Sequence, residues 1–273
     1  MMADGGQAFR WNRKEDGKYI GVVKNNVFEI FQSGDKLIID SNGNNKETAF
    51  IKEYLDIPRD YNKIEQEMLK FEELEPAVKY SSGYRILYQD PWETTISFII
   101  SANNHMRNIK KTIENICRTY GEPISYKGEI YYTFPTPEVL ASLSEDELKF
   151  TKCGYRAKFM IETAKIIASG QIDIYDFKNK SADDIRRELL MLPGVGRKVA
   201  DCIMLYSMRK FEAFPIDVWI KRILEHMYFS DKQISLTKLQ KFAQDRFGEI
   251  AGFIQQYLFY YSRNCWQDMV NKR

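Results

Sequence analysis

The chain has 273 residues, of which 44% are hydrophobic, so it can form one large domain or two domains with a sizeable core. Its net charge of +2 is only weakly basic, so charge alone neither demands nor excludes a nucleic acid partner. No signal peptide is recognisable at the start, and no apolar run approaches the length that spans a membrane.

The cysteines are widely spread and form no CxxC pair, which argues against a zinc ribbon or a redox pair. They are Cys117, Cys153, Cys202 and Cys265. An iron–sulfur cluster needs a close group of four cysteines, and the spacing here excludes it. We interpret the cysteines as free thiols in a reducing cytoplasm. The two histidines, His105 and His226, are far apart, so we predict no side-chain metal site.

The first part of the chain predicts a small antiparallel sheet. Short strands are expected over residues 18–24, 27–32 and 36–40, with Asn-, Asp- and Gly-rich turns between them. A sheet of three strands is marginal by itself, so we expect it to pack against helices. The amphipathic pattern predicts these helices over residues 46–55 and 61–74.

From about residue 86 the pattern is helical almost throughout, with loops near residues 121–128 and 134–137. Ser144 and Ser181 are predicted helix starts, because each has an acidic residue three positions later.

These elements predict an α+β fold with two domains. Residues 1–85 are expected to form an N-terminal antiparallel sheet domain with flanking helices. Residues 86–273 are expected to form a mainly α-helical domain, with two helices joined by a tight hairpin at about residues 185–208.

The hairpin turn is the sequence Pro193-Gly194-Val195-Gly196, between expected helices over residues 185–192 and 197–208. Backbone amides exposed at the start of the second helix can bind an anion such as a DNA phosphate. Such a contact does not read base sequence. An ordinary turn between two helices is the alternative, and these residues alone leave both open. The Walker A pattern of phosphate-binding loops is not met.

Two side chains near the hairpin can carry chemistry. Lys198 lies in the first turn of the second helix, where the helix dipole opposes a cation and favours the neutral, nucleophilic amine. Asp217 precedes an expected helix over residues 218–227, where aspartate is a favoured N-cap. Capping would hold its carboxylate in place to manage protons or positive charge. A solvated lysine and a purely structural cap are the alternatives.

Six short motifs occur in the order in which they appear in one family of repair enzymes. They are residues 6–11, 89–91, 97–104, 154–157, 192–202 with Asp217, and 252–259. With these motifs, and over nearly its whole length, the chain resembles the 8-oxoguanine DNA glycosylases. That family belongs to the superfamily with a helix-hairpin-helix motif, a Gly/Pro-rich loop and a catalytic aspartate.

The resemblance implies excision of oxidised guanine from double-stranded DNA, after the lesion is flipped out of the stack. Lys198 then attacks C1′ of the nucleotide, a Schiff base forms, and β-elimination nicks the strand, while Asp217 stabilises positive charge at the sugar. The expected protein is a monomeric, bifunctional glycosylase and AP lyase of the bacterial nucleoid that requires no cofactor. The alternatives are a superfamily glycosylase for alkylated or mismatched bases, and a non-catalytic DNA-binding protein with the same hairpin.

The resemblance also implies how the flipped base is held. Gln255 bonds the Watson–Crick edge, Phe259 stacks on one face, and Cys202 forms the opposite wall. The backbone carbonyl of Gly6 meets the N7 hydrogen, which 8-oxoguanine has and guanine lacks. Without the resemblance, Cys202 and Phe259 would be interpreted as core residues and Gln255 as a surface residue.

Further residues are implied in holding the DNA. Tyr155 resembles a wedge beside the vacated position, and Asn103 and Arg156 resemble contacts to the base opposite. The amides around Gly194 and Gly196 are expected on a phosphate. The hairpin is also expected to hold a structural K⁺, Na⁺ or Ca²⁺ ion through the backbone carbonyls of Leu190, Leu192 and Val195.

Two departures favour the bacterial, clostridial-type branch over the animal one. Asn108 stands where the eukaryotic enzymes have an arginine, and Trp219 stands where they have a histidine. Because an arginine contact to the opposite cytosine is lost, we expect weaker discrimination of the opposite base.

Overall fold

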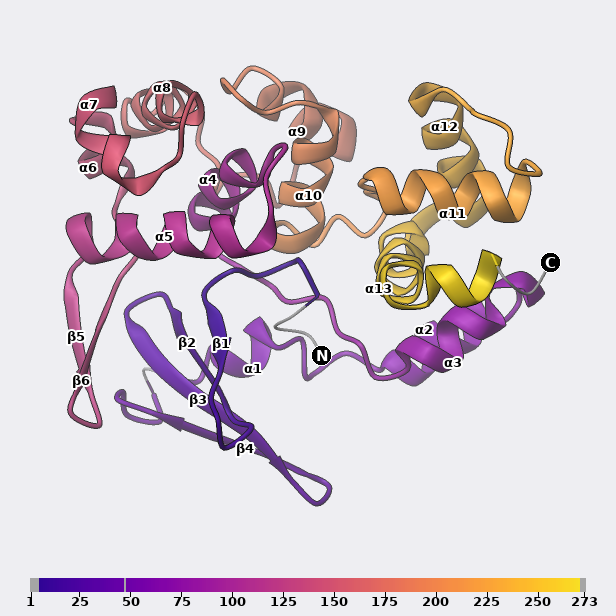
Figure 1. Ribbon diagram of the computed structural model, residues 1–273, viewed down its shortest axis with the longest axis horizontal. Coiled ribbons are helices and arrows are strands. Elements are labelled where there is room, and N and C mark those ends of the chain that lie inside the picture. The colour runs from indigo at the N-terminus through magenta and orange to yellow at the C-terminus, as the bar shows by residue number, and fades with distance from the viewer. Residues whose placement is uncertain (1–4, 47, 271–273) are drawn as a thin grey trace.

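A computed structural model describes residues 5–46 and 48–270, with side chains described as far as residue 267. The fold is α+β, as predicted: a four-stranded sheet lies at one side of the molecule, and helices form the rest (Figure 1). The strands are β1 (Trp11–Arg13), β2 (Tyr19–Val23), β3 (Asn26–Ser33), β4 (Lys36–Ser41), β5 (Pro123–Tyr126) and β6 (Glu129–Tyr132).

The helices before residue 121 are α1 (Ile51–Tyr54), α2 (Tyr61–Met68), α3 (Glu75–Ser81), α4 (Pro91–Ser101) and α5 (Met106–Tyr120). Those after it are α6 (Pro137–Ala141), α7 (Glu145–Leu148), α8 (Arg156–Ala168), α9 (Ala182–Leu189), α10 (Arg197–Ser207), α11 (Val218–Tyr228), α12 (Leu236–Phe247) and α13 (Ala251–Val270). Short 3-10 turns at residues 72–74, 149–151 and 248–250 adjoin α3, α7 and α13.

The larger sheet is antiparallel with strand order β1-β2-β3-β4. Two of its hairpins close where Val23 pairs with Asn26 and where Ser33 pairs with Lys36, so each of these two loops has two residues, a length typical of tight hairpins. The β1–β2 hairpin has a longer loop and closes where Arg13 pairs with Tyr19. The short β1 was not predicted. Trp11 is buried in it and packs with Tyr54 of α1, and this long-range packing stabilises a three-residue strand.

Three predicted boundaries are wrong. The helix expected over residues 61–74 ends at Met68 in α2. The helix expected over residues 46–55 is regular only in α1, and the loop expected near residues 121–128 contains part of the β5–β6 hairpin. Lys127, at the tip of that hairpin, forms ion pairs with Glu29 at 3.0 Å and with Asp40 at 2.8 Å. The hairpin is therefore attached to the larger sheet by contacts that local sequence does not indicate.

The helix starts predicted at two serines are confirmed. Ser144 caps α7, and Glu147 completes a capping box with it. The hydroxyl of Ser181 caps α9 by accepting a hydrogen bond from the amide of Asp184.

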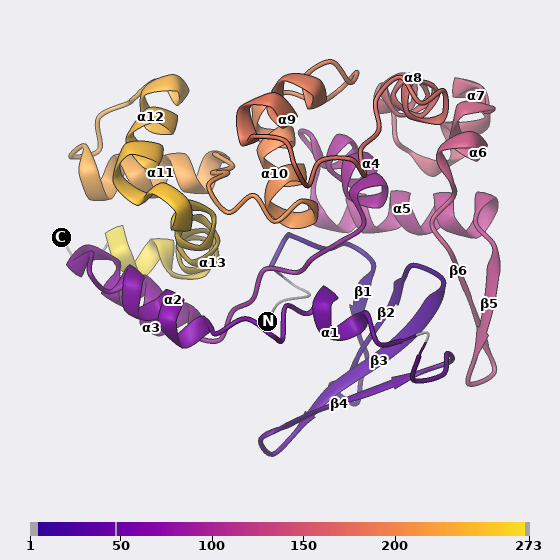
Figure 2. The ribbon, with the colours of Figure 1, turned by 180° about the vertical axis from the view of Figure 1, so that it is seen from behind.

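Helices α2 and α3 lie beside the C-terminal helix α13 in both views (Figures 1 and 2). The hydroxyl of Tyr257 in α13 donates to Glu65 of α2 at 2.8 Å, and the Ser81 hydroxyl donates to the Tyr257 carbonyl at 3.2 Å. Helix α2, part of a segment expected to flank the sheet, therefore packs in the helical part instead, together with α3, which was not predicted. The domain division between residues 85 and 86 stays a prediction.

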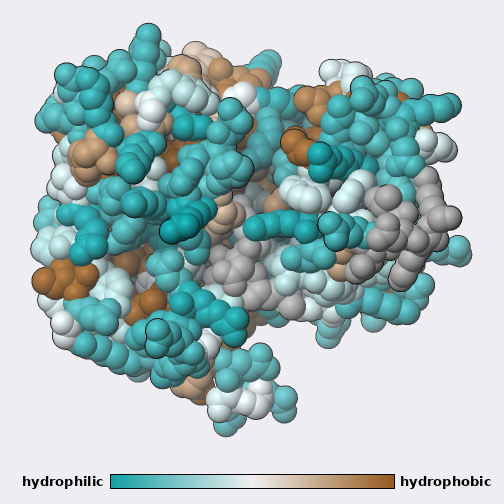
Figure 3. All heavy atoms as spheres, in the orientation of Figure 1, coloured by the Kyte–Doolittle hydropathy of each residue, from teal (hydrophilic) through white to brown (hydrophobic). Residues whose placement is uncertain are grey.

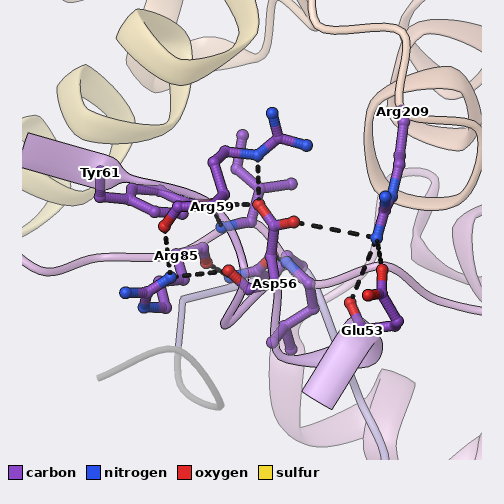
Figure 4. A network of polar contacts seen from close by, with 9 residues as sticks. Glu53, Asp56, Arg59, Tyr61, Arg85 and Arg209 are labelled. Atoms are coloured by element: carbon purple, nitrogen blue, oxygen red, sulfur yellow. Dashed lines mark hydrogen bonds and ion pairs between the residues drawn. The ribbon is translucent and has the colours of Figure 1, made fainter. Parts of the chain in front are cut away.

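A polar network joins the segment after α1 to the loop after α10 (Figure 4). The buried carboxylate of Asp56 accepts hydrogen bonds from Arg59 at 2.6 Å and from the Tyr61 hydroxyl at 3.0 Å. Arg209 forms an ion pair with Glu53 at 2.7 Å and lies 3.8 Å from Asp56. Because the central carboxylate is buried, its paired contacts hold the sheet region and the helical region in one arrangement.

Hydrophilic side chains cover most of the face seen in Figure 3, and hydrophobic ones occur there in small separate groups. Among the residues described, no helix combines the length and the apolar character that crossing a membrane requires.

Candidate active site

Segments far apart in the sequence meet at a cleft of about 820 Å³. It lies between the turn after α4, the hairpin before α10, the start of α11 and the middle of α13. Among the residues that line it are seven of the predicted site residues, namely Gly6, Asn103, Gly194, Gly196, Lys198, Asp217 and Phe259. An amine, a carboxylate and an aromatic ring therefore share one cavity.

Lys198 is half-buried in the first turn of α10 and lines the cleft. Its Nζ lies 5.1 Å from the ring centroid of Phe98, and the side chain also forms a hydrogen bond with the Cys202 thiol one turn later. These contacts hold the amine inside the cavity. Phe98 was not predicted as a site residue, although it lies within the motif at residues 97–104.

Asp217 is the N-cap of α11, as the sequence predicted. Its Oδ1 accepts a hydrogen bond from the backbone amide of Ile220 at 2.8 Å, which orients the carboxylate. Burial raises the pKa of Asp217, while the amide hydrogen bonds and the positive charge of Lys198 counteract that rise. The capping contact and the exposure to the cleft coexist, so the carboxylate is both held in place and available.

Gly6 and Phe259 form the part of the cleft opposite the hairpin. Gly6 has φ +74°, and a Cβ at this position would lie 3.3 Å from the Phe259 ring. A residue with a side chain would therefore be strained and crowded here. The backbone of the loop passes directly beside the aromatic ring.

Gly194 lets the hairpin approach α4 and α8. Its φ is +80°, and a Cβ here would lie 2.8 Å from Cβ of Phe159 and 3.2 Å from a methyl group of Ile99. Gly196, the N-cap of α10, has φ −88° and open space around it. The hydroxyl of Thr163 donates to the Pro193 carbonyl at 2.9 Å and anchors the turn to α8.

Sequence models of two families match consecutive parts of the chain. The model described as the N-terminal domain of 8-oxoguanine DNA glycosylase matches residues 1–95. The model described as the HhH-GPD superfamily of base excision DNA repair proteins matches residues 96–249, more than half of the chain. The chain belongs to the HhH-GPD superfamily.

Solved structures with high similarity come from the same superfamily. The chain is similar to the Clostridium acetobutylicum 8-oxoguanine glycosylase/lyase in complex with DNA containing cytosine opposite 8-oxoguanine, with 42% identity and a TM-score of 0.92. That match covers 96% of this chain and 90% of the other. The structure of MBOgg1 with a low-affinity DNA ligand is 46% identical with a TM-score of 0.93, covering 96% of this chain and 91% of that one.

A curated relative is the probable N-glycosylase/DNA lyase of Methanothermobacter thermautotrophicus, 39% identical over 207 residues. The match covers 67% of this chain and 64% of the relative. The chain therefore matches slightly less than two thirds of that protein's length.

Cys202 lies one turn after Lys198, below the surface of this HhH-GPD cleft rather than on it. Burial raises the pKa of its thiol to about 11, although the charge of Lys198 and its hydrogen bond oppose the rise. The thiol is therefore neutral at neutral pH and is not a nucleophile. Its contact with a flipped base stays a prediction.

Gln255 is only 3% exposed, so the interpretation of this residue as a surface side chain is wrong. Its Oε1 is buried and has no hydrogen-bond partner among the described residues. An unsatisfied buried carbonyl costs free energy, so a side chain with this unmet acceptor is suited to receive a hydrogen bond from a ligand.

Arg156 is only 8% exposed, and its guanidinium donates to backbone carbonyls of the turn after α4. Its Nε lies 2.9 Å from the Ala102 oxygen, and its Nη2 lies 2.8 Å from the Asn103 oxygen. Asn103 is exposed with φ +47°, and Arg156 thus supports the turn that presents it.

Tyr155 is 58% exposed and packs edge-on against Phe159. Contacts of Tyr155, Asn103 and Arg156 with DNA stay predictions.

Asp201 is a hairpin residue that the sequence reasoning missed. It is fully buried in α10 and accepts from Arg186 of α9 at 2.9 Å and from Arg197 at 3.3 Å. The ion pair with Arg186 ties α9 to α10, the helices of the HhH-GPD hairpin, and the pair with Arg197 lies within α10, although burial raises the pKa of the carboxyl. Its place one turn after both Arg197 and Lys198, in the helix expected over residues 197–208, was the available signal.

Gly194→Ala is expected to destabilise the protein by roughly 2 to 4 kcal/mol, because positive φ and the contact with Phe159 both penalise a side chain. Urea unfolding followed by circular dichroism measures the loss. Gly196→Ala is the matched control and should cost about 1 kcal/mol or less, because only the capping preference changes. Equal losses in the two variants would show that the hairpin does not depend on the close approach at Gly194.

Proposed function

We propose that this protein is a bifunctional DNA glycosylase and AP lyase that excises 8-oxoguanine from duplex DNA and nicks the strand. The observation that carries the proposal is the shared cleft, which is lined by Lys198, Asp217, the loop at Gly6 and Phe259. The similarity to the glycosylase/lyases described above supports the same reaction.

In the proposed reaction Lys198 releases its proton, and its amine then forms a bond to C1′ while the bond from C1′ to N9 breaks. The bonding electron pair leaves with the base, which then takes up a proton. Opening of the sugar ring converts the adduct into a Schiff base. Loss of a C2′ proton and departure of the 3′ phosphate then nick the strand. Asp217, held by the start of α11, stabilises the positive charge that develops at the sugar.

Recognition of the base is proposed to rest on few groups. The Gly6 carbonyl accepts a hydrogen bond from N7–H of 8-oxoguanine, whereas the N7 lone pair of guanine would face that oxygen. Phe259 stacks on the base, with Cys202 behind the opposite face. Gln255 bonds the Watson–Crick edge, and its buried, unpartnered Oε1 supports this role. A wrong base would leave buried polar groups of the site without hydrogen-bond partners, so the site rejects that base strongly.

Contacts with the rest of the DNA are proposed to come from the two turns beside the cleft. The amides around Gly194 and Gly196 bind a phosphate at the start of α10. The exposed ring of Tyr155 fills the vacated position, and Asn103 contacts the opposite base, with Arg156 at its side. These contacts fix the position of the duplex, while the base pocket supplies the selectivity.

No cofactor is proposed for the chemistry. Within the described part of the chain, no group of three or more His, Cys, Asp and Glu residues is placed to hold a metal ion. A structural K⁺, Na⁺ or Ca²⁺ ion on the carbonyls of Leu190, Leu192 and Val195 stays a prediction. The Leu192 carbonyl already accepts from the Val195 amide at 3.1 Å, and its second lone pair fits such a role. Monomeric state and location at the bacterial nucleoid also stay predictions.

Borohydride trapping tests the proposed function. The protein is incubated with duplexes that carry 8-oxoguanine opposite cytosine, normal guanine opposite cytosine, or 3-methyladenine opposite thymine, and covalent adducts are separated on a denaturing gel. We expect an adduct and a nicked strand with the 8-oxoguanine duplex only. An adduct mainly with the alkylated base would instead identify a different superfamily glycosylase. Binding without an adduct, a nick or release of any base would identify a non-catalytic DNA-binding protein.

A further inference from the structure

A chain of buried polar side chains runs from α10 through α13 to the loop that contains Gly6. Its members are all at most 4% exposed and are Tyr206, Gln256, Tyr84 and Gln7. The Tyr206 hydroxyl donates to Oε1 of Gln256 at 2.5 Å, and Nε2 of Gln256 donates to the Tyr84 hydroxyl at 3.1 Å. The chain lies below the cleft, since none of its members lines it.

The hydroxyl of Tyr84 is the junction of this chain. It also accepts a hydrogen bond from Nε2 of Gln7 at 3.3 Å. The same Gln7 nitrogen donates to the Arg85 carbonyl at 2.8 Å, and Oε1 of Gln7 accepts from the Leu87 amide at 2.8 Å. Both the nitrogen and the oxygen of the Gln7 amide are thus bonded, and they attach the loop to the segment at residues 85–87, before α4.

The residue on the other side of Gly6 is held by the same chain. Nε2 of Gln256 lies 3.4 Å from the Gly5 carbonyl oxygen. A Cβ at Gly5 would lie only 1.4 Å from the Tyr84 hydroxyl, so the loop backbone packs directly on that phenol. Gly6, with φ +74°, therefore lies between two anchored neighbours. A Cβ at Gly6 would lie 3.3 Å from the Phe259 ring.

The chain also links the loop to the reactive amine. Tyr206 and Lys198 lie on the same helix, about two turns apart. The Tyr206 ring stacks on the Phe98 ring with a centroid distance of 5.5 Å. The Lys198 Nζ lies over the same Phe98 ring, 5.1 Å from its centroid. Phe98 and Tyr206 thus connect this chain to the packing around the amine, while the amine itself forms no hydrogen bond to the chain among the described residues.

We propose that Gln256 and Tyr84 are positioning residues. They hold the Gly6 carbonyl where it can accept a hydrogen bond from N7–H of the flipped base. The inference rests on the proposed function, in which that carbonyl separates 8-oxoguanine from guanine. A hydrogen bond weakens steeply when its geometry departs from the optimum, so a single carbonyl discriminates only if its backbone is rigid. The buried chain of hydrogen bonds supplies that rigidity, because breaking any one of these bonds leaves a polar group unsatisfied in the core.

Tyr84→Phe tests the inference, since it removes only the junction hydroxyl and keeps the ring. We expect the ratio of kcat/KM for 8-oxoguanine over guanine to fall about tenfold, corresponding to one lost hydrogen bond. Cleavage at a preformed abasic site needs no base recognition and should stay within about twofold of the wild-type rate. Gln256→Met, which removes both amide groups with little change of length, should act in the same direction.

Tyr54→Phe is the matched control. The hydroxyl of Tyr54 is also buried and accepts one hydrogen bond, from Nε1 of Trp11 at 2.8 Å, but it lies outside the chain that holds Gly6. We expect this variant to leave the ratio unchanged. If Tyr84→Phe also leaves the ratio unchanged, or if it lowers base excision and abasic-site cleavage in parallel, the positioning role is wrong.

Hydrogen exchange separates this inference from the proposed function. Without DNA, backbone amides of residues 5–8 should exchange faster in Tyr84→Phe than in the wild type and in Tyr54→Phe. Equal exchange in all three proteins would overturn the positioning role, whatever the activity. A wild-type protein that excises no 8-oxoguanine would overturn the proposed function, and the exchange data would then decide alone whether the chain holds the loop.

Discussion

Lys198→Gln is expected to abolish the borohydride-stable adduct and to lower the excision rate of 8-oxoguanine by about a thousandfold or more. A glutamine fills nearly the same space beside Phe98, but its amide nitrogen has no lone pair available to attack C1′. Single-turnover excision from the 8-oxoguanine duplex measures the loss. Mass spectrometry of the trapped wild-type protein should place the adduct on Lys198.

Lys63→Gln is the matched control for this experiment. Lys63 lies on α2 with its side chain 81% exposed, and it forms only a loose ion pair with Asp60 at 3.7 Å. Such surface pairs contribute little, so the variant should fold and react like the wild type. An adduct that persists in Lys198→Gln would assign the nucleophile to another amine and would remove the central residue of the proposed mechanism.

Asp217→Asn is expected to slow excision by about a thousandfold while the fold is retained. Asparagine caps a helix about as well as aspartate, so the hydrogen bond from Ile220 and the start of α11 should persist. The lost property is the negative charge beside the sugar. Single-turnover kinetics at neutral pH measure the change. Near wild-type rates in this variant would reduce Asp217 to a helix cap.

The same substitution is expected to stabilise the protein at neutral pH. Burial raises the pKa of Asp217 above its unfolded value, so folding favours the protonated form, and the stability contributed by that form is lost as pH rises through the folded pKa. At neutral pH the wild type therefore holds a buried charge that asparagine lacks. Urea unfolding should show a higher free energy of unfolding for Asp217→Asn at pH 7 and a vanishing difference below the ordinary pKa of aspartate, about 3.9.

Asp217→Ala distinguishes the charge from the cap. Alanine removes both, and loss of an N-cap costs about 1 kcal/mol. This variant should be as slow as Asp217→Asn but less stable than it at every pH. Identical stability of the two variants would contradict the capping role at the start of α11. For Asp217→Asn, a gain in stability with a loss of rate is the pattern expected where a buried charge destabilises the fold but serves catalysis.

Several features of this protein could be predicted from short stretches of the sequence. The hairpin at Gly194, the helix that begins beside Lys198 and the cap at Asp217 depend on backbone preferences within a few residues. The antiparallel sheet follows from alternating strands and two-residue turns in the same way. Gly6 was predicted only through the family motif, because its own sequence gives no reason for the positive φ.

Other features could not be predicted, because they depend on partners distant in the sequence. Arg156 was predicted only as a DNA contact, which stays a prediction, and its support of a turn 53 residues away through the Asn103 carbonyl was not predicted. Gln255 was expected at the surface without the family resemblance, and packing of α13 buries it. The β5–β6 hairpin depends on Lys127, whose partner Glu29 is 98 residues away.

By itself, then, the sequence determined the chemical groups and the local backbone that presents them, because turns, caps and helix starts are decided by neighbouring residues. Only the tertiary structure decided which of those groups share one cleft and what holds each of them still. Gln256 and Tyr84 are 172 residues apart, and Gln256 and Gly5 are 251 apart. Contacts over such separations arise from packing of whole helices, and no local preference encodes them.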